Sequence, residues 1–377
     1  MMDIYQVCNN CIMDTTDSTI KFDSKGVCIY CENFKKTVLP SWKDSDTQKL
    51  SKVVEQIKEY GKGKDFDCII GLSGGLDSSY LAYIAKEKLG LRPLLFHVDA
   101  GWNTESAVGN IEKLVDGLDL DLYTEVINWE EMKSLQLSFL KSQIPHQDIP
   151  QDTAFFSALY KFARKHKIKY VLTGGNISTE CIREPEQWGV LPGTDKRLIL
   201  DIHSKYGEVP LRTFPIIDVF VSKIYYKYIL RMQVVKPLDF IDYVKKDAEA
   251  ELAEIFGWKK FQHKHHESRF TRFFEDYWLI QKFGFDKRKA HFSSLILTNQ
   301  MTRLEAIDRL KKPELSNDFL ESEFEYVAHK LDISKEDLKK IFIGKNKTVK
   351  DYRSKQFLIG FASKVVSILG IEKRLYK

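Results

Sequence analysis

The pattern of hydrophobic and polar positions divides the first half of the chain into short apolar runs that alternate with helical segments. Four apolar runs with the length of buried strands lie at 68–72, 92–99, 121–127 and 168–173. Apolar residues recur with helical spacing between them, at 104–118, 129–142 and 152–167. Strands that alternate with helices pair in parallel through right-handed crossovers, so the pattern predicts an α/β fold with a parallel sheet and flanking helices.

The segments outside this sheet are mostly helical. A charged helix is predicted at 46–60, before the first strand. After residue 293 the pattern predicts helices at 301–311, 317–331, 335–343 and 357–369. No motif marks these last helices, so we expect them to pack on the sheet domain or to form the contact of a homodimer.

Composition places the protein among soluble globular proteins. The chain has 377 residues, of which 43% are hydrophobic and 29% charged, enough for two or three domains. No apolar run approaches the ~20 residues that span a bilayer, and the first residues lack the features of a signal peptide, so we expect a cytoplasmic protein without a membrane partner. A net charge of +5 is too small to indicate a nucleic-acid partner by itself.

Four of the six cysteines form two C-x2-C pairs that are sixteen residues apart. This spacing is typical of a tetrahedral zinc site, with an iron–sulfur cluster as the alternative. A short alternating strand at 19–23 and a turn at 24–26 between the pairs predict a zinc ribbon. Four thiolates fill the coordination sphere, so the metal is predicted to be structural. The predicted ligands are Cys8, Cys11, Cys28 and Cys31.

The first strand is followed directly by Ser-Gly-Gly-Leu-Asp-Ser-Ser at 73–79 and then by a helix. A glycine loop between a strand and a helix directs backbone N–H groups and the helix dipole at one point, which suits a phosphate. No lysine follows as in a P-loop; instead Asp77 lies in the first helical turn, where a carboxylate beside phosphates suggests Mg²⁺. The loop resembles the signature of the PP-loop ATP pyrophosphatases. The residues predicted to bind ATP here are Ser73, Gly74, Gly75, Leu76, Asp77, Ser78 and Ser79.

Two other strand ends should lie beside this loop, because ligands of parallel sheets bind at the carboxyl ends of the strands. These ends are 97–101 and 173–180. In PP-loop enzymes the corresponding regions contact adenosine and complete the magnesium site. The resemblance therefore implies nucleotide contacts for Asp99, Thr173, Gly174, Gly175 and Glu180. Asp99 as a plain turn carboxylate remains an alternative, and His97 is expected to be a buried, hydrogen-bonded histidine.

A basic and aromatic tract follows Gly257. Residues 258–292 contain nine Lys or Arg against four Asp or Glu. Such a tract could bind nucleic acid, bind an acidic small molecule beside the ATP site, or form a solvated helix face. The helical spacing of Phe270, Phe273, Phe274 and Tyr277 places these aromatic residues in the core. The cations Lys264, Arg269, Lys287 and Arg288 are then expected to face phosphate or carboxylate. A metal site at His263, His265 and His266 is a further alternative.

Taken together, these motifs and their order resemble the N-acetyl sugar amidotransferases, the WbpG-type PP-loop enzymes of bacterial surface-sugar biosynthesis. The shared segments are the cysteine pairs, the loop, 148–156, 173–180, 264–270 and 284–288. The resemblance implies a PP-loop (adenine nucleotide alpha hydrolase-like) fold and four regions. These regions are a zinc ribbon at 1–40, a helical linker at 41–66, an ATP pyrophosphatase domain at 67–235 and a helical substrate-binding or packing region at 236–377.

The implied reaction converts an acetamido group of a nucleotide-linked or nonulosonic sugar to an acetamidino group, with ATP, Mg²⁺ and structural Zn²⁺. ATP is split to AMP and pyrophosphate, and ammonia comes from a separate glutaminase with a cyclase-like partner. The implied catalytic residues are Asp77, Ser78, Lys264 and Arg288. The implied substrate-binding residues are Asn176, Lys264, His265, His266, Arg269, Lys287 and Arg288.

Two alternatives to the amidotransferase remain. A PP-loop enzyme that thiolates tRNA would share the loop, the ribbon and the basic tract, and it would need Cys181 as sulfur carrier. Cys68 begins a buried strand and is expected to be a core residue. A noncatalytic nucleotide-binding protein is the other alternative, and the intact Ser73, Asp77 and Ser78 argue against it.

Overall fold

The computed structural model describes residues 5–43, 47–191, 194–261 and 264–360. Its centre is a five-stranded parallel sheet with the order β3-β2-β1-β4-β5. The strands are β1 Cys68–Gly71, β2 Pro93–Asp99, β3 Leu122–Val126, β4 Tyr170–Leu172 and β5 Gln233–Val235. The predicted α/β fold and its parallel sheet are thereby confirmed. The fifth strand escaped prediction because it is a three-residue edge strand with little apolar signal.

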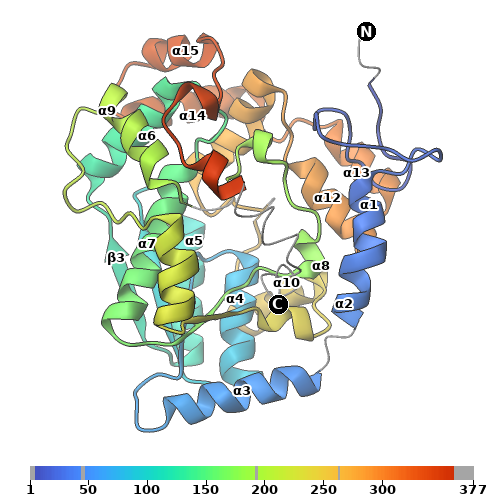
Figure 1. Cartoon of the computed structure of the whole chain (residues 1–377), viewed down its shortest axis with the longest axis vertical. Helices are drawn as coiled ribbons and strands as arrows, with labels where there is room; N and C mark the ends of the chain where they lie inside the picture. Colours follow the sequence, from blue (N-terminus) through green and yellow to red (C-terminus); the bar gives the residue numbers. More distant parts are fainter. Residues whose placement is uncertain (1–4, 44–46, 192–193, 262–263, 361–377) are drawn as a thin grey trace.

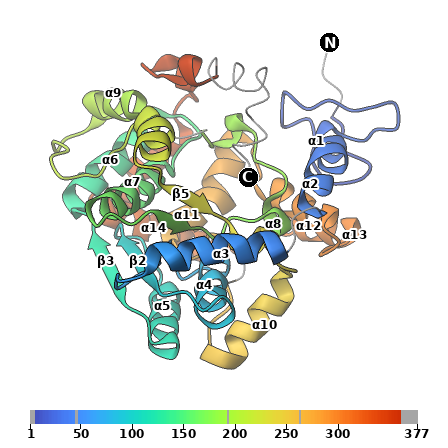
Figure 2. The ribbon, with the colours of Figure 1, turned by 60° about the horizontal axis from the view of Figure 1, so that its bottom comes forward.

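Helices cover both faces of the sheet, and the alternation of side chains in β1 explains why. Cys68 and Ile70 point into one core, while Ile69 points into the other. The first core is closed by α3 Thr47–Gly61, α4 Leu76–Tyr83, α5 Glu105–Leu118 and α10 Lys245–Phe256. The second is closed by α6 Trp129–Ser142, α7 Ile149–Lys165 and α9 Lys196–Tyr206. Figure 2 shows these two helical layers below and above the sheet.

The N-terminal region is a small knuckled unit, with isolated bridges from Val7 to Asp14 and from Phe22 to Cys28. The strand predicted at 19–23 is thus reduced to one bridge, because α1 starts directly after Cys28. The helices α1 Ile29–Asn33, η1 Phe34–Val38 and α2 Leu39–Lys43 follow. The unit packs beside α12 and α13 (Figure 1). Arg303 of α13 donates hydrogen bonds to the carbonyls of Cys8 and Cys11, at 3.0 and 2.9 Å.

The C-terminal region is helical, as the pattern predicted. Its elements are α11 Arg269–Phe273, η6 Phe274–Phe283, α12 Arg288–Leu297, α13 Arg303–Leu310, α14 Asn317–Lys330, α15 Lys335–Ile343 and η7 Val349–Asp351. Phe270, Phe273 and Phe274 are fully buried, which confirms their predicted place in the core. Of the helix predicted at 357–369, the part beyond residue 360 lies outside the described residues. No helix among the described residues is long and apolar enough to cross a bilayer.

The shorter elements lie in the connections. They are η2 Ile84–Lys88, α8 Ile177–Glu180, η3 Glu186–Trp188, η4 Val221–Ile229 and η5 Pro237–Phe240.

One segment ties the C-terminal region to the sheet. Residues 264–269, which we call the strap, run past the carboxyl end of β2 and form an antiparallel bridge between Ser268 and Asn103. Thr104 N donates to Glu267 O at 2.9 Å, and Arg269 N donates to Trp102 O at 2.8 Å. The strap therefore lies at the sheet edge where parallel α/β folds bind their ligands.

Candidate active site

The glycine loop lies between β1 and α4, as predicted, and its shape is held by distant residues. Gly74 has a φ of +82°, and a Cβ there would lie 2.4 Å from Ala107 O, so only glycine fits. Its carbonyl accepts hydrogen bonds from Trp258 Nε1 at 3.2 Å and Asn110 Nδ2 at 3.3 Å. Gly75 is the N-cap of α4 and brings no side-chain cap to the helix. The first-turn N–H groups are thus placed to receive an anion.

Two loop serines close the loop on itself. Ser73 Oγ lies 3.1 Å from Ser78 Oγ, and Ser78 Oγ also accepts from Ser73 N at 3.2 Å. Ser79 is fully buried, and its hydroxyl has no hydrogen-bond partner among the described residues. Ser73 and Ser78 therefore present hydroxyls at the loop, while the role of the Ser79 side chain in ATP binding stays a prediction.

Asp77 lies at the centre of a charged group above the loop. Its Oδ1 accepts from Tyr243 OH at 2.5 Å and from Asn176 Nδ2 at 3.3 Å. Its Oδ2 lies 3.3 Å from Lys264 Nζ, and Lys264 also pairs with Glu180. Burial acts to lower the pKa of Lys264, but the two carboxylates outweigh it and raise that pKa, so the amine stays charged. We call Asp77, Lys264, Glu180, Tyr243 and Asn176 the Asp77 site.

The segment after β4 is fitted tightly against α4. A Cβ on Gly174 would lie 2.7 Å from the carbonyl of Asp77, so the close approach requires glycine. Asn176 caps α8, its Oδ1 accepting from Thr179 N at 2.8 Å. The side chains of Glu180 and Lys236 lie next to Gly175. The structure thus brings Thr173–Glu180 beside the loop, as expected for the carboxyl ends of parallel strands.

Asp99 and His97 lie at the end of β2, one strand away. Asp99 Oδ1 accepts from Gly101 N at 2.8 Å and from Asn103 Nδ2 at 3.2 Å, the turn role that the sequence left open. His97 is buried, with Nδ1 2.8 Å from Leu72 O and Nε2 3.0 Å from Asn103 Nδ2. His97 is therefore the hydrogen-bonded buried histidine that the sequence predicted.

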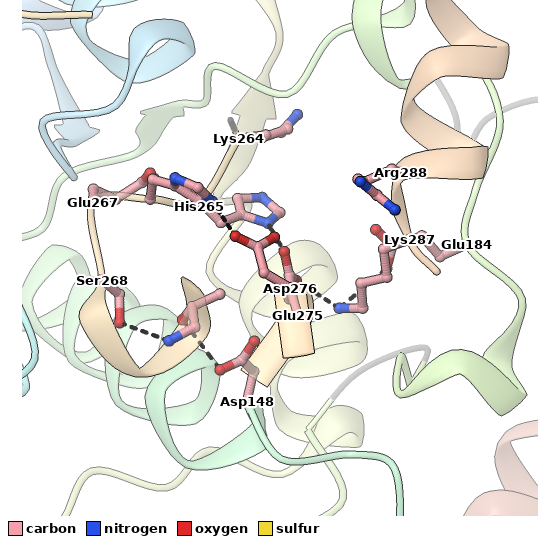
Figure 3. Close-up of polar contacts among 12 residues, drawn as sticks. Asp148, Glu184, Lys264, His265, Glu267, Ser268, Glu275, Asp276, Lys287 and Arg288 are labelled. Atoms are coloured by element: carbon pink, nitrogen blue, oxygen red, sulfur yellow. Dashed lines mark hydrogen bonds and ion pairs between the residues drawn. The ribbon is translucent and has the colours of Figure 1, made fainter. Parts of the chain in front are cut away.

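A second charged group lies beside the strap (Figure 3). Its members are Glu275, Lys287, His265 and Glu184, and we call it the Glu275 cluster. Glu275 contacts Lys287 Nζ at 2.8 Å and His265 Nδ1 at 3.2 Å. Lys287 also lies 3.3 Å from Glu184. His265 has a φ of +63°, a left-handed conformation that is uncommon for histidine and turns the strap at this point. The cluster joins two segments that the resemblance had singled out separately, 264–270 and 284–288.

Two aspartates of α7 and its N-cap border this cluster. Asp148 Oδ1 accepts from Gln151 Nε2 at 3.1 Å and from Thr271 Oγ1 at 3.2 Å. Burial raises the pKa of Asp148 to about 8, and the charge of Glu275 adds to the effect. Asp152 is exposed, but desolvation by the surrounding protein raises its pKa to about 6.

The remaining predicted cations form ion pairs within the chain. Arg288 holds Asp286 through Nε at 2.9 Å and Nη2 at 2.7 Å, and it holds Glu314 through Nη1 at 2.5 Å. Arg269 pairs with the buried Glu323 at 2.6 Å. The carboxylates that these arginines face are thus the protein's own, and their roles in substrate binding and catalysis stay predictions. His266 Nε2 lies 2.8 Å from Asp276, and His263 falls outside the described residues.

The ion pair of His265 predicts a pH-dependent stability. Burial acts to lower the pKa of His265, but Glu275 outweighs it and raises that pKa to about 9, from an ordinary value of 6.5. Charged His265 therefore stabilises the fold fully below pH 6.5, and this contribution is lost as the pH rises through 9. Urea unfolding should show a fall in stability over this range that His265→Gln makes shallower. The exposed His329 offers the control, and an unchanged slope in His265→Gln would contradict the pairing.

The four predicted metal ligands also come together. Cys8, Cys11, Cys28 and Cys31 are buried, and their Sγ atoms all lie within 4.8 Å of one another. Backbone N–H groups of Asn10 and Cys28 donate to Cys8 Sγ at 3.4 and 3.2 Å, as expected around thiolates. The structure thus shows four thiols that could bind one metal ion, such as zinc.

Comparison with known proteins places the C-terminal part of the chain. Residues 267–366 match the family model described as "LPS biosynthesis protein WbpG-like, C-terminal domain". This segment, which we call the WbpG-like domain, is similar to the C-terminal domain of that family. The predicted resemblance to the WbpG-type proteins is thereby confirmed, and the WbpG-like domain contributes Glu267, Glu275 and Lys287 to the groups described above.

A second comparison covers a longer stretch at lower similarity. The chain is 24% identical over 188 residues to the uncharacterized protein MJ1599 of Methanocaldococcus jannaschii. The matched part is 48% of this chain and 63% of that relative, so it covers less than two thirds of the relative's length. We therefore infer function from the WbpG-like match and not from this relative.

Several residues of the site escaped the sequence analysis. Glu267 lies 3.3 Å from Ser73 Oγ, Tyr243 contacts Asp77, and Lys245 is among the charges that face Asp77. Glu267 could have been found, since it lies in the strap and opens the WbpG-like domain. Tyr243 and Lys245 belong to a stretch without motif, and only the fold reveals their place.

Proposed function

We propose that this protein is an ATP-dependent amidotransferase that converts an acetamido group of an activated sugar to an acetamidino group. The observation that carries the proposal is the contact between the glycine loop and the WbpG-like domain, where Glu267 lies 3.3 Å from Ser73. A phosphate-binding loop and a segment of the surface-sugar family thus belong to one site. The WbpG-like domain by itself supports an enzyme of LPS biosynthesis.

The loop residues fit ATP. The N–H groups of Gly75, Leu76 and Asp77, with the hydroxyls of Ser73 and Ser78, would hold the pyrophosphate portion. Asp77 and Glu180 would hold Mg²⁺, which would neutralise the charge that builds up on the departing pyrophosphate. Lys264, which lies between these two carboxylates, would turn to the phosphates when the metal takes its place. Asp99, Thr173, Gly174 and Gly175 would contact the adenosine.

The reaction needs adenylylation because an amide carbonyl is a poor electrophile and hydroxide is a poor leaving group. The carbonyl oxygen would attack the α-phosphorus of ATP, and pyrophosphate would depart. Ammonia would then attack the imidate carbon and AMP would leave. The Glu275 cluster, with His265, His266, Lys287, Asn176 and the nearby Arg269 and Arg288, is the proposed sugar site, and cations there would stabilise developing negative charge.

We also propose that ammonia comes from a separate glutaminase with a cyclase-like partner. All six cysteines lie within the described residues. Four form the predicted metal site and Cys68 is fully buried in β1. Cys181 packs against the apolar cluster that includes these four cysteines, and burial raises its pKa to about 11. A thiol of this kind is a poor nucleophile, which weighs against a glutaminase in this chain and against the tRNA-thiolating alternative.

The test is ammonia-dependent AMP release in the presence of candidate acetamido sugars or of bulk tRNA. The panel includes a nucleotide-linked diacetamido uronic acid and the nonulosonic pseudaminic and legionaminic acids. We expect one sugar to stimulate release of AMP and pyrophosphate, with equal activity in Cys181→Ser. Formation of ADP and phosphate, or a tRNA-stimulated activity that Cys181→Ser abolishes, would overturn the proposal.

A further inference from the structure

His291 lies on the face of α12 that packs against the segment carrying Glu180. Positions 287, 291, 294 and 298 share one face of this helix, because they are separated by four, three and four residues. On this face Lys287 contacts Glu184 at 3.3 Å, and Thr298 Oγ1 donates to Ser178 O at 2.7 Å. His291 therefore lies between the Glu275 cluster and the Asp77 site.

The His291 ring lies close to the backbone of Thr179, the residue before Glu180. Its Nε2 is buried and has no hydrogen-bond partner among the described residues. A neutral imidazole carries a proton on one ring nitrogen and a lone pair on the other. With the proton on Nδ1, the lone pair is on Nε2, the nitrogen without a partner.

The surroundings of His291 keep the imidazole neutral. Burial and the positive charges of Lys245, Lys264 and His265 hold the pKa of His291 well below its ordinary value. These three cations come from the N-terminus of α10 and from the strap, and they face both charged groups of the site. A neutral imidazole with an available lone pair can accept a proton during a reaction.

We propose that Nε2 of His291 is the proton acceptor of the ammonia step, which makes His291 a catalytic residue. This inference rests on the proposed function. The nitrogen of ammonia forms a bond to the imidate carbon and becomes positively charged. Nε2 takes one of its protons, the C–O bond to AMP breaks, and its electron pair leaves on AMP. The imidazolium then returns the proton to solvent. The ammonium group of the adduct is more acidic than free ammonium, because its carbon carries an electron-withdrawing adenylyl oxygen.

The two halves of the reaction separate this role from a structural one. Adenylylation of the sugar needs no proton acceptor of this kind, so sugar-dependent exchange of pyrophosphate into ATP should be within about twofold of wild type in His291→Asn. Asparagine is polar and smaller than histidine, but it has no basic nitrogen. Amidine formation with saturating ammonia should fall about 10²–10⁴-fold. His291→Gln serves as second variant, His329→Asn as control, and circular dichroism melting verifies the fold.

Retained exchange with lost amidine formation in both variants would support the inference. Loss of both half-reactions in the variants, or full amidine formation by them, would overturn the inference. In that case sugar-dependent exchange by the wild-type protein would still support the proposed function. Absence of sugar-dependent exchange in wild type would instead overturn the proposed function, and the inference with it.

Discussion

Asp77→Asn should lower the rate of sugar-dependent AMP release by about 100-fold or more while leaving the fold intact. The carboxylate is the proposed Mg²⁺ ligand in the first turn of α4, and an amide oxygen without charge binds Mg²⁺ more weakly. The fold should survive because asparagine can still accept the hydrogen bond of Tyr243, and Lys264 keeps its ion pair with Glu180.

Steady-state kinetics at several Mg²⁺ concentrations, together with thermal melting, would measure this effect. Asp116→Asn is the matched control, because Asp116 is exposed on α5, the neighbouring helix. Unchanged turnover in Asp77→Asn would refute the assigned role. A melting temperature that falls in parallel with activity would show that Asp77 acts mainly through the hydrogen bonds and ion pair of the Asp77 site.

Purified protein should contain about one zinc ion per chain, and Cys28→Ser should lose it together with much of the stability of the N-terminal region. Metal binding to four thiolates contributes on the order of 10 kcal/mol to folding in small zinc domains, and residues 5–31 have little core without it. The loss should extend to α12 and α13, because Arg303 and Ser293 bond the backbone of this region.

Elemental analysis and chemical denaturation measure this prediction. Cys181→Ser is the control, because Cys181 packs against the same apolar cluster but is not one of the four predicted ligands. Full metal content and stability in Cys28→Ser would contradict the four-cysteine site. Iron with visible absorbance in place of zinc would select the iron–sulfur alternative.

The sheet could be predicted because its signals are local. The hydrophobic periodicity of a buried strand or helix is visible within ten or fifteen residues of sequence. Because the carboxyl ends of parallel strands meet at one edge of the sheet, the sequence also predicted that 73–79 and 173–180 lie together. β5 escaped because three residues at an edge carry no such periodicity. The boundaries of the predicted regions remain predictions, although the N-terminal unit packs closely on the C-terminal helices.

The partners of the cations could not be predicted because each partner is distant in the sequence. A guanidinium can bind a ligand or a carboxylate of its own chain, and the residue type does not distinguish the two. Arg288 meets Glu314 and Arg269 meets Glu323 only because α12 and α11 fold against the segments that carry these acids. The place of Tyr243 beside Asp77 likewise depends on the fold, because the two residues are 166 positions apart in the sequence.

The strap also limits how relatives of this protein can be recombined. The WbpG-like domain begins at Glu267, in the middle of the strap, with Lys264 and His265 on one side of that boundary and Ser268 on the other. A hybrid joined at residue 267 would combine the loop-facing lysine of one parent with the sheet-binding serine of another. A junction at Gly257, where α10 ends in a left-handed turn, would transfer the strap together with its helices. Trp258 would be transferred too, and it would still have to form its hydrogen bond with the glycine loop of the other parent. We therefore expect the glycine loop and the C-terminal domain to change together, so that transfer of the C-terminal domain alone would not transfer the proposed sugar specificity.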